Sequence, residues 1–500
     1  MKRGEASDSA VANLEALQPL DLCACKTVSD IVEGMRRCSF GARMLGEVAH
    51  TLAEWVDGEK KPLVIFGGRS DTPLGKLLES MHARGWFRDI LSPQYYGASR
   101  RRRREHVLVV GGFTDQDTPA LFGRPERAIF INPWGLAPPE QAQDGHFHDV
   151  LFSDPLLIMQ ILENVLTERR EGFPVKVSAL LECLSRYGGV ASAVSHGAAV
   201  LEAMVADPDC TVFLTISGAM TIAKMGLVIC DMIDLKMVRH LTTTGALMAH
   251  GLIENMGLPH LRYDPRISDK ELAELKLNRI TNVLEPESNF DELERRIIYP
   301  VLDECAAEGA FLIGSGELYG RIGKFLSQHF PEGRGILKSA FERGVPVYTP
   351  AFWDSEIGNN VFHWNRQREE RGEPRIVLDL ERDVRRLVEA FTKTARVGIF
   401  TIGGGVPRNT VQNTAPLLEL MHAHGLTHFP IRQIWYGCRI CPDPMWLGHL
   451  SGCTYSEGGS WRKIDPKGLF AEVLADATVV WPFLVKHIMD QAERGAITLS

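Results

Sequence analysis

The feature that most constrains this chain is a repeated succession of short apolar strands, glycine-rich turns and amphipathic helices. Amphipathic stretches such as Asp291–Ala306 and Thr410–His424 predict helices between many of the strands. Apolar or β-branched runs, most of which end near Gly, Ser, Thr or Pro, predict strands at Leu63–Phe66, His106–Val110, Ala128–Ile131, Val212–Thr215, Leu241–Thr243, Phe311–Ile313, Val345–Tyr348, Val397–Ile402 and Ala477–Trp481. This alternation predicts an α/β fold with a doubly wound, mostly parallel sheet.

The length and composition narrow the class of protein. With 500 residues the chain exceeds one ordinary core, because domains hold roughly 100–200 residues. A net charge of -8 argues against nucleic-acid binding, and ten cysteines are too few for a disulfide scaffold. The longest uncharged stretches fall short of the roughly 20 residues that span a bilayer, and the N-terminus lacks the apolar core of a secretory signal. We therefore expect a cytoplasmic protein that binds neither nucleic acid nor membrane.

An internal repeat is indicated in the first half of the chain. Asp30–Val56 aligns without gaps on Ala179–Val205, and a nearly equal offset places VIFGG (Val64–Gly68) on VFLTI. VLVVGG (Val107–Gly112) is expected to match LTTTG. The alignment predicts a smaller, degenerate α/β copy in residues 1–168, with at least four strands in residues 60–155, before a larger domain in residues 169–500. The alternative is two generic helix–strand units with the same pattern.

Two predicted strand ends carry glycine and hydroxyl groups. TIGGGVPRN (Thr401–Asn409) follows one strand with three glycines, and LTTTGAL (Leu241–Leu247) ends another. Glycines allow the backbone to approach a phosphate or ribose, and ligands bind at the carboxyl ends of parallel strands. A tight strand-to-helix turn is the alternative for the first segment.

A third segment, SGCTYSEGGSWRKI (Ser451–Ile464), collects reactive side chains among small residues. It contains Glu457, Trp461 and Lys463. A lysine beside a tryptophan can be a desolvated amine suited to Schiff-base chemistry. From these residues alone, a surface lysine beside a packed tryptophan is the favoured interpretation.

Read in order, these segments resemble the deoxyhypusine synthase family. The similar stretches cover about residues 175–490 and are LNRITNVLEPESNF, VPVYTPAFWDSEIGN, IVLDLERDVRRL, IFTIGGGVPRNTVQN, SGCTYSEGGSWRKI and ADATVVWPFLV. The resemblance implies a Rossmann-like topology that binds NAD. It also implies transfer of a 4-aminobutyl group from a polyamine or related amine, through a lysine imine, to a protein lysine or another acceptor amine.

The resemblance assigns roles residue by residue. Lys463 falls at the position of the imine-forming catalytic lysine. The positions implied to bind substrate are Glu457, Trp461, Asn413, Asn359, Asn409 and Ser451. The positions implied to bind NAD are Ser217, Gly218, Ala219, Thr243, Thr244, Gly245, Asp354, Gly404, Asp476, Ala477 and Thr478. The family also implies a homotetramer, a dimer of dimers.

The chain departs from the family pattern at several of these positions. Asn359 and Leu450 stand where the family has acidic residues, and Asn409 stands where it has a histidine. An insertion, roughly Tyr436–Leu447, precedes the lysine segment. Because a buried ammonium group without a carboxylate is costly, the losses indicate that the amine substrate differs from that of the family. A homospermidine synthase-like reaction on small molecules, or a non-catalytic subunit that pairs with an active paralogue, are the alternative functions.

Two further patterns receive no role in catalysis. Cys438 and Cys441, with His449 and Cys453, have a zinc-like composition but fit no common zinc spacing, so buried thiols are the preferred interpretation and no metal is predicted. The run Arg100–Arg104 is interpreted as a solvated loop, with contact to an acidic partner as the alternative.

Overall fold

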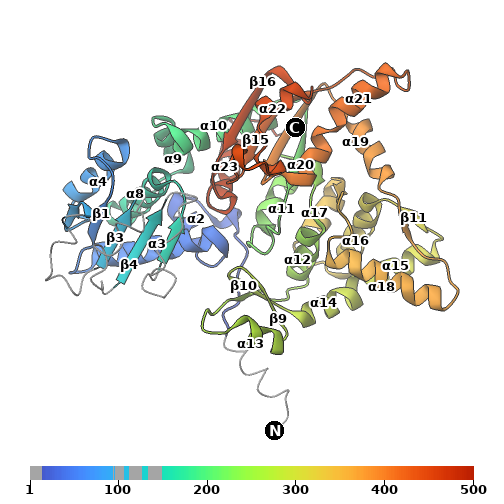
Figure 1. The fold of residues 1–500 in the computed structure, drawn as a ribbon, viewed down its shortest axis with the longest axis horizontal. Coiled ribbons are helices and arrows are strands. Elements are labelled where there is room, and N and C mark those ends of the chain that lie inside the picture. Colours follow the sequence, from blue (N-terminus) through green and yellow to red (C-terminus); the bar gives the residue numbers. More distant parts are fainter. Residues whose placement is uncertain (1–13, 94, 96–105, 112–126, 133–148, 500) are drawn as a thin grey trace, which may run out of the picture. The chain divides into compact units, whose positions relative to one another are not determined.

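The computed structural model describes residues 14–93, 95, 106–111, 127–132 and 149–499 (Figure 1). The chain forms two compact units. The larger unit contains Gly197–Ala477 with the described residues of Met1–Leu22 and Ile488–Ser500, and the smaller contains Cys23–His196 and Thr478–His487. The sequence predicts a domain boundary between residues 168 and 169, whereas the boundary between the two compact units lies between His196 and Gly197. The run Arg100–Arg104 lies outside the described residues.

The larger unit is built around a six-stranded sheet in which all neighbouring strands are parallel. The strand order is β12-β7-β6-β14-β15-β16. The strands are β6 (Cys210–Ile216), β7 (His240–Thr242), β12 (Val347–Tyr348), β14 (Arg396–Ile402), β15 (Ile434–Ile440) and β16 (Ile464–Val473). β14 lies at the centre, where Phe400 is paired with Leu214 on one side and Cys438 on the other. Its residues are almost all buried, as expected of a parallel strand covered on both faces.

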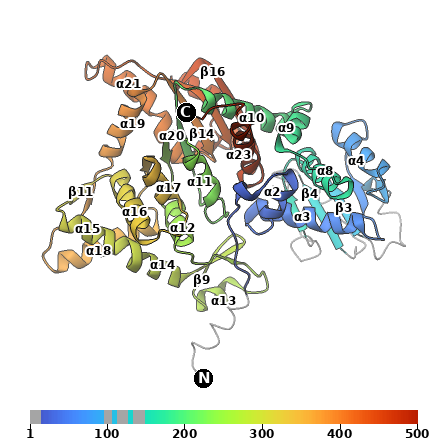
Figure 2. The same ribbon diagram turned by 180° about the vertical axis from the view of Figure 1, so that it is seen from behind.

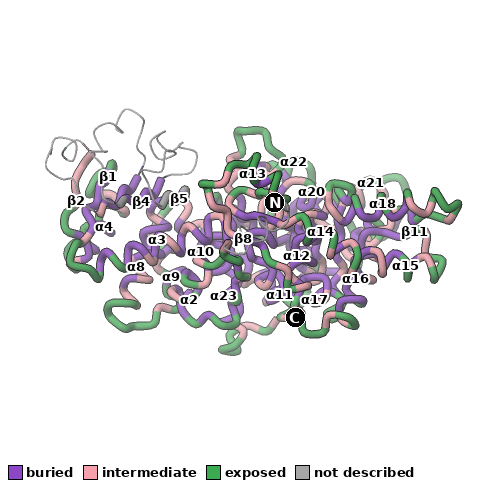
Figure 3. The backbone as a smooth tube through the Cα atoms, turned by 90° about the horizontal axis from the view of Figure 1, so that it is seen from below, coloured by how far each residue is buried: buried purple, intermediate pink, exposed green. Residues whose placement is uncertain are grey.

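Helices and two small sheets complete the larger unit. Seen from behind, α11, α12 and α17 lie next to one another (Figure 2), and buried residues run along α11 and α12 (Figure 3). The small sheets are the antiparallel β8-β10-β9 and the parallel β11-β13. Their strands are β8 (Leu261–Arg262), β9 (Leu277–Ile280), β10 (Val283–Pro286), β11 (Leu312–Ile313) and β13 (Val377–Leu378).

The helix bounds in the larger unit are as follows. They are α11 (Gly226–Asp234), α12 (Gly245–Asn255), α13 (Asp269–Glu274), α14 (Glu287–Leu293), α15 (Tyr299–Ala307), α16 (Ser315–His329), α17 (Ile336–Arg343), α18 (Glu356–Glu370), α19 (Glu381–Lys393), α20 (Gly405–Gln412), α21 (Thr414–Ala423) and α22 (Tyr455–Ser460). A π-helical turn, η2 (Glu294–Ile298), joins α14 to α15, and short 3-10 turns, η3 (Met445–Leu447) and η4 (Leu450–Gly452), precede α22. The helices α10 (Gly189–Ala206) and α23 (Ala477–Glu493) each contribute residues to both units.

The smaller unit contains a five-stranded parallel sheet in the order β2-β1-β3-β4-β5. Its strands are β1 (Leu63–Phe66), β2 (Asp89–Leu91), β3 (His106–Val110), β4 (Arg127–Asn132) and β5 (Asp149–Phe152). The remaining elements are η1 (Leu22–Ala24), α2 (Val28–Met35), α3 (Phe40–Asp57), α4 (Pro73–Ala83), α8 (Pro155–Glu171) and α9 (Val177–Ser185). The prediction of at least four strands in residues 60–155 is confirmed.

The structure confirms the α/β class with mostly parallel sheets and corrects several elements. Ala477–Trp481, predicted as a strand, forms the first turns of α23. Val479–Trp481 and Phe483–Val485 are all buried, and a helix that is apolar on every side shows no helical periodicity in its sequence. β15 and β16 were not predicted; the expected insertion from Tyr436 begins inside β15, a strand of the main sheet.

In the described part of the chain, one helix, α10, is long and apolar enough by length and composition to cross a membrane. Of this stretch, 44% is buried inside the structure. A single helix of this kind is weak evidence for a membrane span, because the core helix of a globular protein passes the same test.

Candidate active site

The glycine loop after β14 packs closely against two other segments of the larger unit. Gly403 has a φ of +80°, a backbone conformation that favours glycine. The Gly404 amide donates to Oγ of Ser217 at 2.9 Å. A Cβ atom on Gly404 would lie 2.7 Å from Cα of Ser451, so no larger residue fits there without a backbone shift. The loop therefore brings the end of β6 and the start of the lysine segment together.

The lysine segment turns back through α22 and places Lys463 directly before β16. The Lys463 backbone amide donates to the Gly458 carbonyl at 3.0 Å, which closes the turn. Its Nζ donates to Oδ1 of Asn409 at 2.7 Å and lies 5.5 Å from the ring centroid of Trp461. Burial lowers the pKa of the Lys463 amine, and the positive charge of Arg408 lowers that pKa further. Lys463 is thus half-buried and shifted toward its neutral, nucleophilic form.

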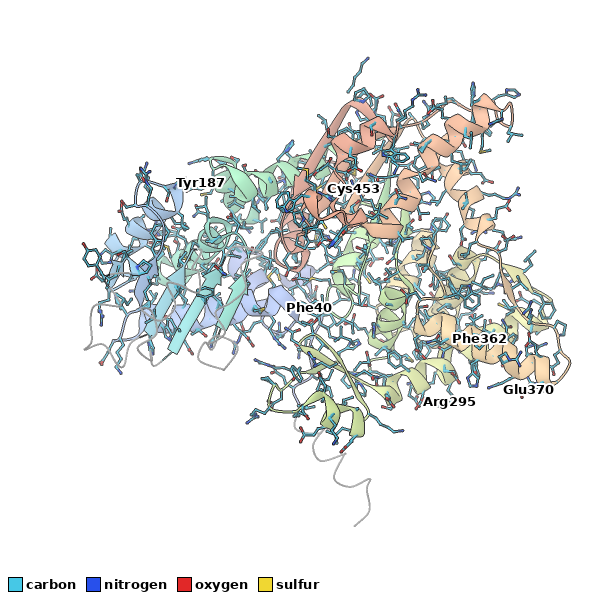
Figure 4. All side chains as sticks on the ribbon, viewed as in Figure 1. Phe40, Tyr187, Arg295, Phe362, Glu370 and Cys453 are labelled. Atoms are coloured by element: carbon cyan, nitrogen blue, oxygen red, sulfur yellow. The ribbon has the colours of Figure 1, made fainter. Side chains whose placement is uncertain are left out.

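These groups line one cavity of about 240 Å³. The lining residues are Gly405, Arg408, Asn409, Gln412, Asn413, Leu450, Cys453, Thr454, Glu457, Gly458, Trp461 and Lys463. Five of the predicted catalytic and substrate residues therefore meet in one place. Cys453, labelled in Figure 4, comes just before α22.

Two residues predicted to bind substrate do not line this cavity. Ser451 is in contact with the glycine loop, and its hydroxyl donates to Asp443. Asn359 is exposed on α18, where its Nδ2 donates to Oε2 of Glu356 at 3.2 Å. A substrate contact from Asn359 stays a prediction.

Six of the residues predicted to bind NAD lie at the carboxyl ends of β6 and β7. Ser217, Gly218 and Ala219 follow β6, and Thr243, Thr244 and Gly245 follow β7. The Thr244 hydroxyl donates to the Gly218 carbonyl at 2.8 Å, which joins the two loops. The Thr243 hydroxyl is fully buried and has no hydrogen-bond partner among the described residues.

The other predicted cofactor residues are more widely distributed. Asp354 is exposed after β12, and Asp476 and Ala477 follow β16. Thr478 belongs to the smaller unit, where its buried hydroxyl accepts a hydrogen bond from the Ala42 amide at 3.0 Å. Cofactor contacts from these residues stay predictions.

Arg408 is the main residue of the cavity to which the sequence assigned no role. It is buried, its Nη1 donates to the Cys453 carbonyl at 2.6 Å, and its guanidinium lies 4.9 Å from the Tyr455 ring centroid. The signal in the sequence that could have identified Arg408 was its position in TIGGGVPRN, next to Asn409. A surface arginine and a buried one look the same in a sequence, so burial was needed to identify it.

A buried ionic cluster lies elsewhere in the larger unit. His250 Nδ1 and His260 Nε2 both contact Oε2 of Glu285, at 3.0 and 2.5 Å. Among the described residues, this is the one group of three or more His, Cys, Asp or Glu side chains placed to hold a metal. However, Nζ of Lys224 lies 2.6 Å from Nδ1 of His260. The direct contacts of both imidazoles with Glu285 and the Lys224 amine beside His260 fit a buried hydrogen-bonded cluster, and we assign no metal to it.

Two cysteines of the zinc-like pattern, Cys438 and Cys441, are buried thiols, whereas Cys453 is half-buried. Burial raises the pKa of Cys438 to about 12, and it also raises the pKa of Cys441. Cys438 lies inside β15, and neither cysteine belongs to a metal-binding group in the described part of the chain.

Comparison with known proteins agrees with this arrangement. A family model described as deoxyhypusine synthase matches residues 179–488. The chain is similar to "Probable deoxyhypusine synthase 1" of Archaeoglobus fulgidus, at 30% identity over 320 residues that cover 63% of this chain and 95% of the relative. It is also similar to "Deoxyhypusine synthase-like protein" of Chlorobaculum parvum, at 29% identity over 301 residues, 59% of this chain and 81% of the relative. Because the family model matches more than half of its residues, the chain belongs to the deoxyhypusine synthase family.

Proposed function

We propose that the chain is an NAD-dependent aminoalkyl transferase that carries the alkyl group of an amine as an imine on Lys463. The observation that supports this most is the state of the Lys463 amine. It is half-buried in a small cavity, held by Asn409, and its pKa is lowered by burial and by Arg408. A neutral amine in such a site is a nucleophile, and its partial burial would limit the access of water to the imine.

The residues at the strand ends fit a dinucleotide. If the six strands of the larger sheet are numbered as they occur along the chain, their spatial order is 3-2-1-4-5-6. In sheets of this kind, ligands bind at the point where the strand order reverses, which here lies between β6 and β14. Gly404 and Ser217 lie at this point, and the unpartnered Thr243 hydroxyl lies at the end of β7. Ser217, Gly218, Thr243, Thr244 and Gly404 would hold the cofactor. The chemistry supplied by bound NAD would be removal of a hydride from the carbon beside the substrate amine, and its later return.

The side chains of the cavity would carry out the remaining steps. Glu457 would accept the ammonium end of the amine, and Trp461 would cover the reacting carbon. The Lys463 nitrogen adds to the oxidised carbon, its proton passes to the departing amine, and the alkyl group remains on Lys463 as an imine. An acceptor amine then adds to the same carbon and displaces Lys463. Asn409 holds one N–H of Lys463, which leaves the nitrogen lone pair free to point elsewhere.

Reductive trapping tests the proposal. The full chain is incubated with NAD and putrescine or spermidine, borohydride is added, and the peptide containing Lys463 is examined by mass spectrometry. We expect an aminobutyl adduct on Lys463 that depends on NAD. Absence of an adduct with every amine tested, in protein that binds NAD, would contradict the proposed function.

We also propose that the smaller unit is a degenerate copy of the catalytic fold. The pairs α2–α3 and α9–α10 each precede an interior strand, β1 and β6 respectively. Phe40 and Gly189, which match in the repeat, both have positive φ at the start of an 18-residue helix. The order β2-β1-β3-β4-β5 corresponds to β7-β6-β14-β15-β16. In this correspondence β3 is equivalent to β14. The VLVVGG segment, which includes most of β3, therefore matches the β14 segment before Gly403, and not the LTTTG segment at the end of β7 as expected.

A further inference from the structure

One edge of a buried guanidinium is left without a partner at the wall of the lysine cavity. Arg408 is 2% exposed and lines the cavity. Its Nη1 donates a hydrogen bond to the Cys453 carbonyl, whereas Nε and Nη2 have no hydrogen-bond partner among the described residues. Nε and Nη2 form one side of the guanidinium, with two parallel N–H groups. That side is the fork that binds a carboxylate through two hydrogen bonds.

Among the described residues, no carboxylate pairs with Arg408. The Glu472 carboxylate is nearby but is already engaged, since Oε2 accepts from Nη2 of Arg439 at 3.0 Å and Oε1 accepts from the Tyr455 amide at 2.5 Å. Arg408 forms no ion pair within the described part of the chain. A buried, unpaired guanidinium is costly, so this site is stabilised by any ligand that brings an anion.

The charges of the cavity point the same way. Its lining includes two basic residues, Arg408 and Lys463, and one carboxylate, Glu457. Leu450 adds an apolar surface, and the other polar side chains are uncharged: those of Asn409, Gln412, Asn413, Cys453, Thr454 and Trp461. One carboxylate can hold one ammonium group, so the cavity is poorly suited to a dication and well suited to a molecule that carries both an ammonium and an anion.

We propose that the amine substrate carries a carboxylate, which binds the Nε and Nη2 edge of Arg408 while Glu457 holds an ammonium group. The substrate class is therefore an amino acid with a side-chain amine, in place of a simple polyamine. This inference rests on the proposed function of Lys463 but concerns a different group of the substrate.

A matched pair of amines tests the inference. Ornithine is putrescine with one added carboxylate, so the two probes differ only in the group that Arg408 would bind. Each is titrated calorimetrically into the full chain and, separately, trapped on Lys463 with NAD and borohydride. We expect ornithine to bind and to label about 10- to 100-fold more effectively than putrescine, the factor that a pair of charge-assisted hydrogen bonds provides.

Variants assign the preference to Arg408. Arg408→Met is expected to abolish the difference between ornithine and putrescine in calorimetric binding, and Arg408→Lys is expected to restore part of that difference. Arg462→Met is the control, since Arg462 is an exposed arginine beside Lys463 that does not line the cavity. Equal binding of the two probes by the unmodified chain would overturn the inference, even if Arg408→Met failed to fold. Labelling by putrescine in that case would leave the proposed function standing, and preferential binding of ornithine without any labelling would overturn only the imine chemistry.

Discussion

At the scale of single residues, a substitution of Lys463 distinguishes imine formation from NAD binding. Arginine in its place keeps the positive charge and cannot form an imine, so Lys463→Arg is expected to abolish trapping and turnover. NAD binding and thermal stability are expected to stay close to those of the unmodified protein. Mass spectrometry measures the adduct, and calorimetry measures NAD binding. Appreciable transfer by this variant would remove Lys463 from the mechanism.

The lowered pKa of Lys463 also predicts a pH profile. Only the neutral amine adds to carbon, so single-turnover trapping is expected to rise with pH and to level off above the pKa of Lys463. Because burial and Arg408 lower that pKa, the midpoint should lie below the ordinary lysine value of about 10.4. In Arg408→Met one of the two causes is gone, and the midpoint should move upward. A midpoint at or above the ordinary value would contradict the electrostatic account.

Leu450 tests how charge sets the choice of amine. It lines the cavity, so Leu450→Asp adds a carboxylate there and is expected to improve binding and trapping of putrescine or spermidine. Asn359→Asp provides the comparison, because Asn359 is exposed and lies outside this cavity. An effect of Asn359→Asp equal to that of Leu450→Asp would show that α18 contributes to the amine site. No effect of either would mean that added charge does not set the preference.

At the scale of elements, the loop between β14 and α20 depends on the absence of a side chain. Gly404→Ala would press a Cβ atom against the backbone of Ser451 and is expected to lower the free energy of unfolding by about 1–3 kcal/mol. It should also weaken NAD binding, since the loop supplies the proposed cofactor site. Gly320→Ala is the control, because Gly320 lies within α16 and an added Cβ meets open space. Denaturant unfolding and calorimetry distinguish the two variants, and equal stabilities would contradict the close approach.

Several elements were predictable from sequence, and the exceptions have a common cause. β1 and β3 begin and end at the predicted residues, because their short apolar runs are bounded by glycine, proline or a charged residue. The Ala477–Trp481 segment at the start of α23 predicts a strand because it is a short apolar run with three β-branched residues. It forms a helix that is buried on all sides, so no exposed polar residues mark a helical period. β16 was missed because most of its residues are partly exposed, so it lacks the apolar run of its neighbours.

At the scale of the whole molecule, the two units are expected to respond differently to NAD. The larger contains the proposed cofactor loops, whereas the smaller has Gly68-Arg69-Ser70 after β1, and an arginine there would alter a dinucleotide pocket. Hydrogen exchange with and without NAD is expected to show protection at the ends of β6, β7 and β14. The strands β1 to β5 should exchange at the same rate in both conditions. Protection in β1 to β5 instead would mean that the copy binds the cofactor.

The sequence by itself determined the α/β class, the glycine loop after β14 and the lysine segment, because each depends on residues that are neighbours in the chain. The tertiary structure alone decided which side chains meet. Lys463 and Asn409, which are hydrogen-bonded, are 54 residues apart in the sequence, and Arg408 and Cys453 are 45 residues apart. Burial and the lack of a partner for one edge of Arg408 are properties of packing between distant segments, and no local pattern of residues encodes them.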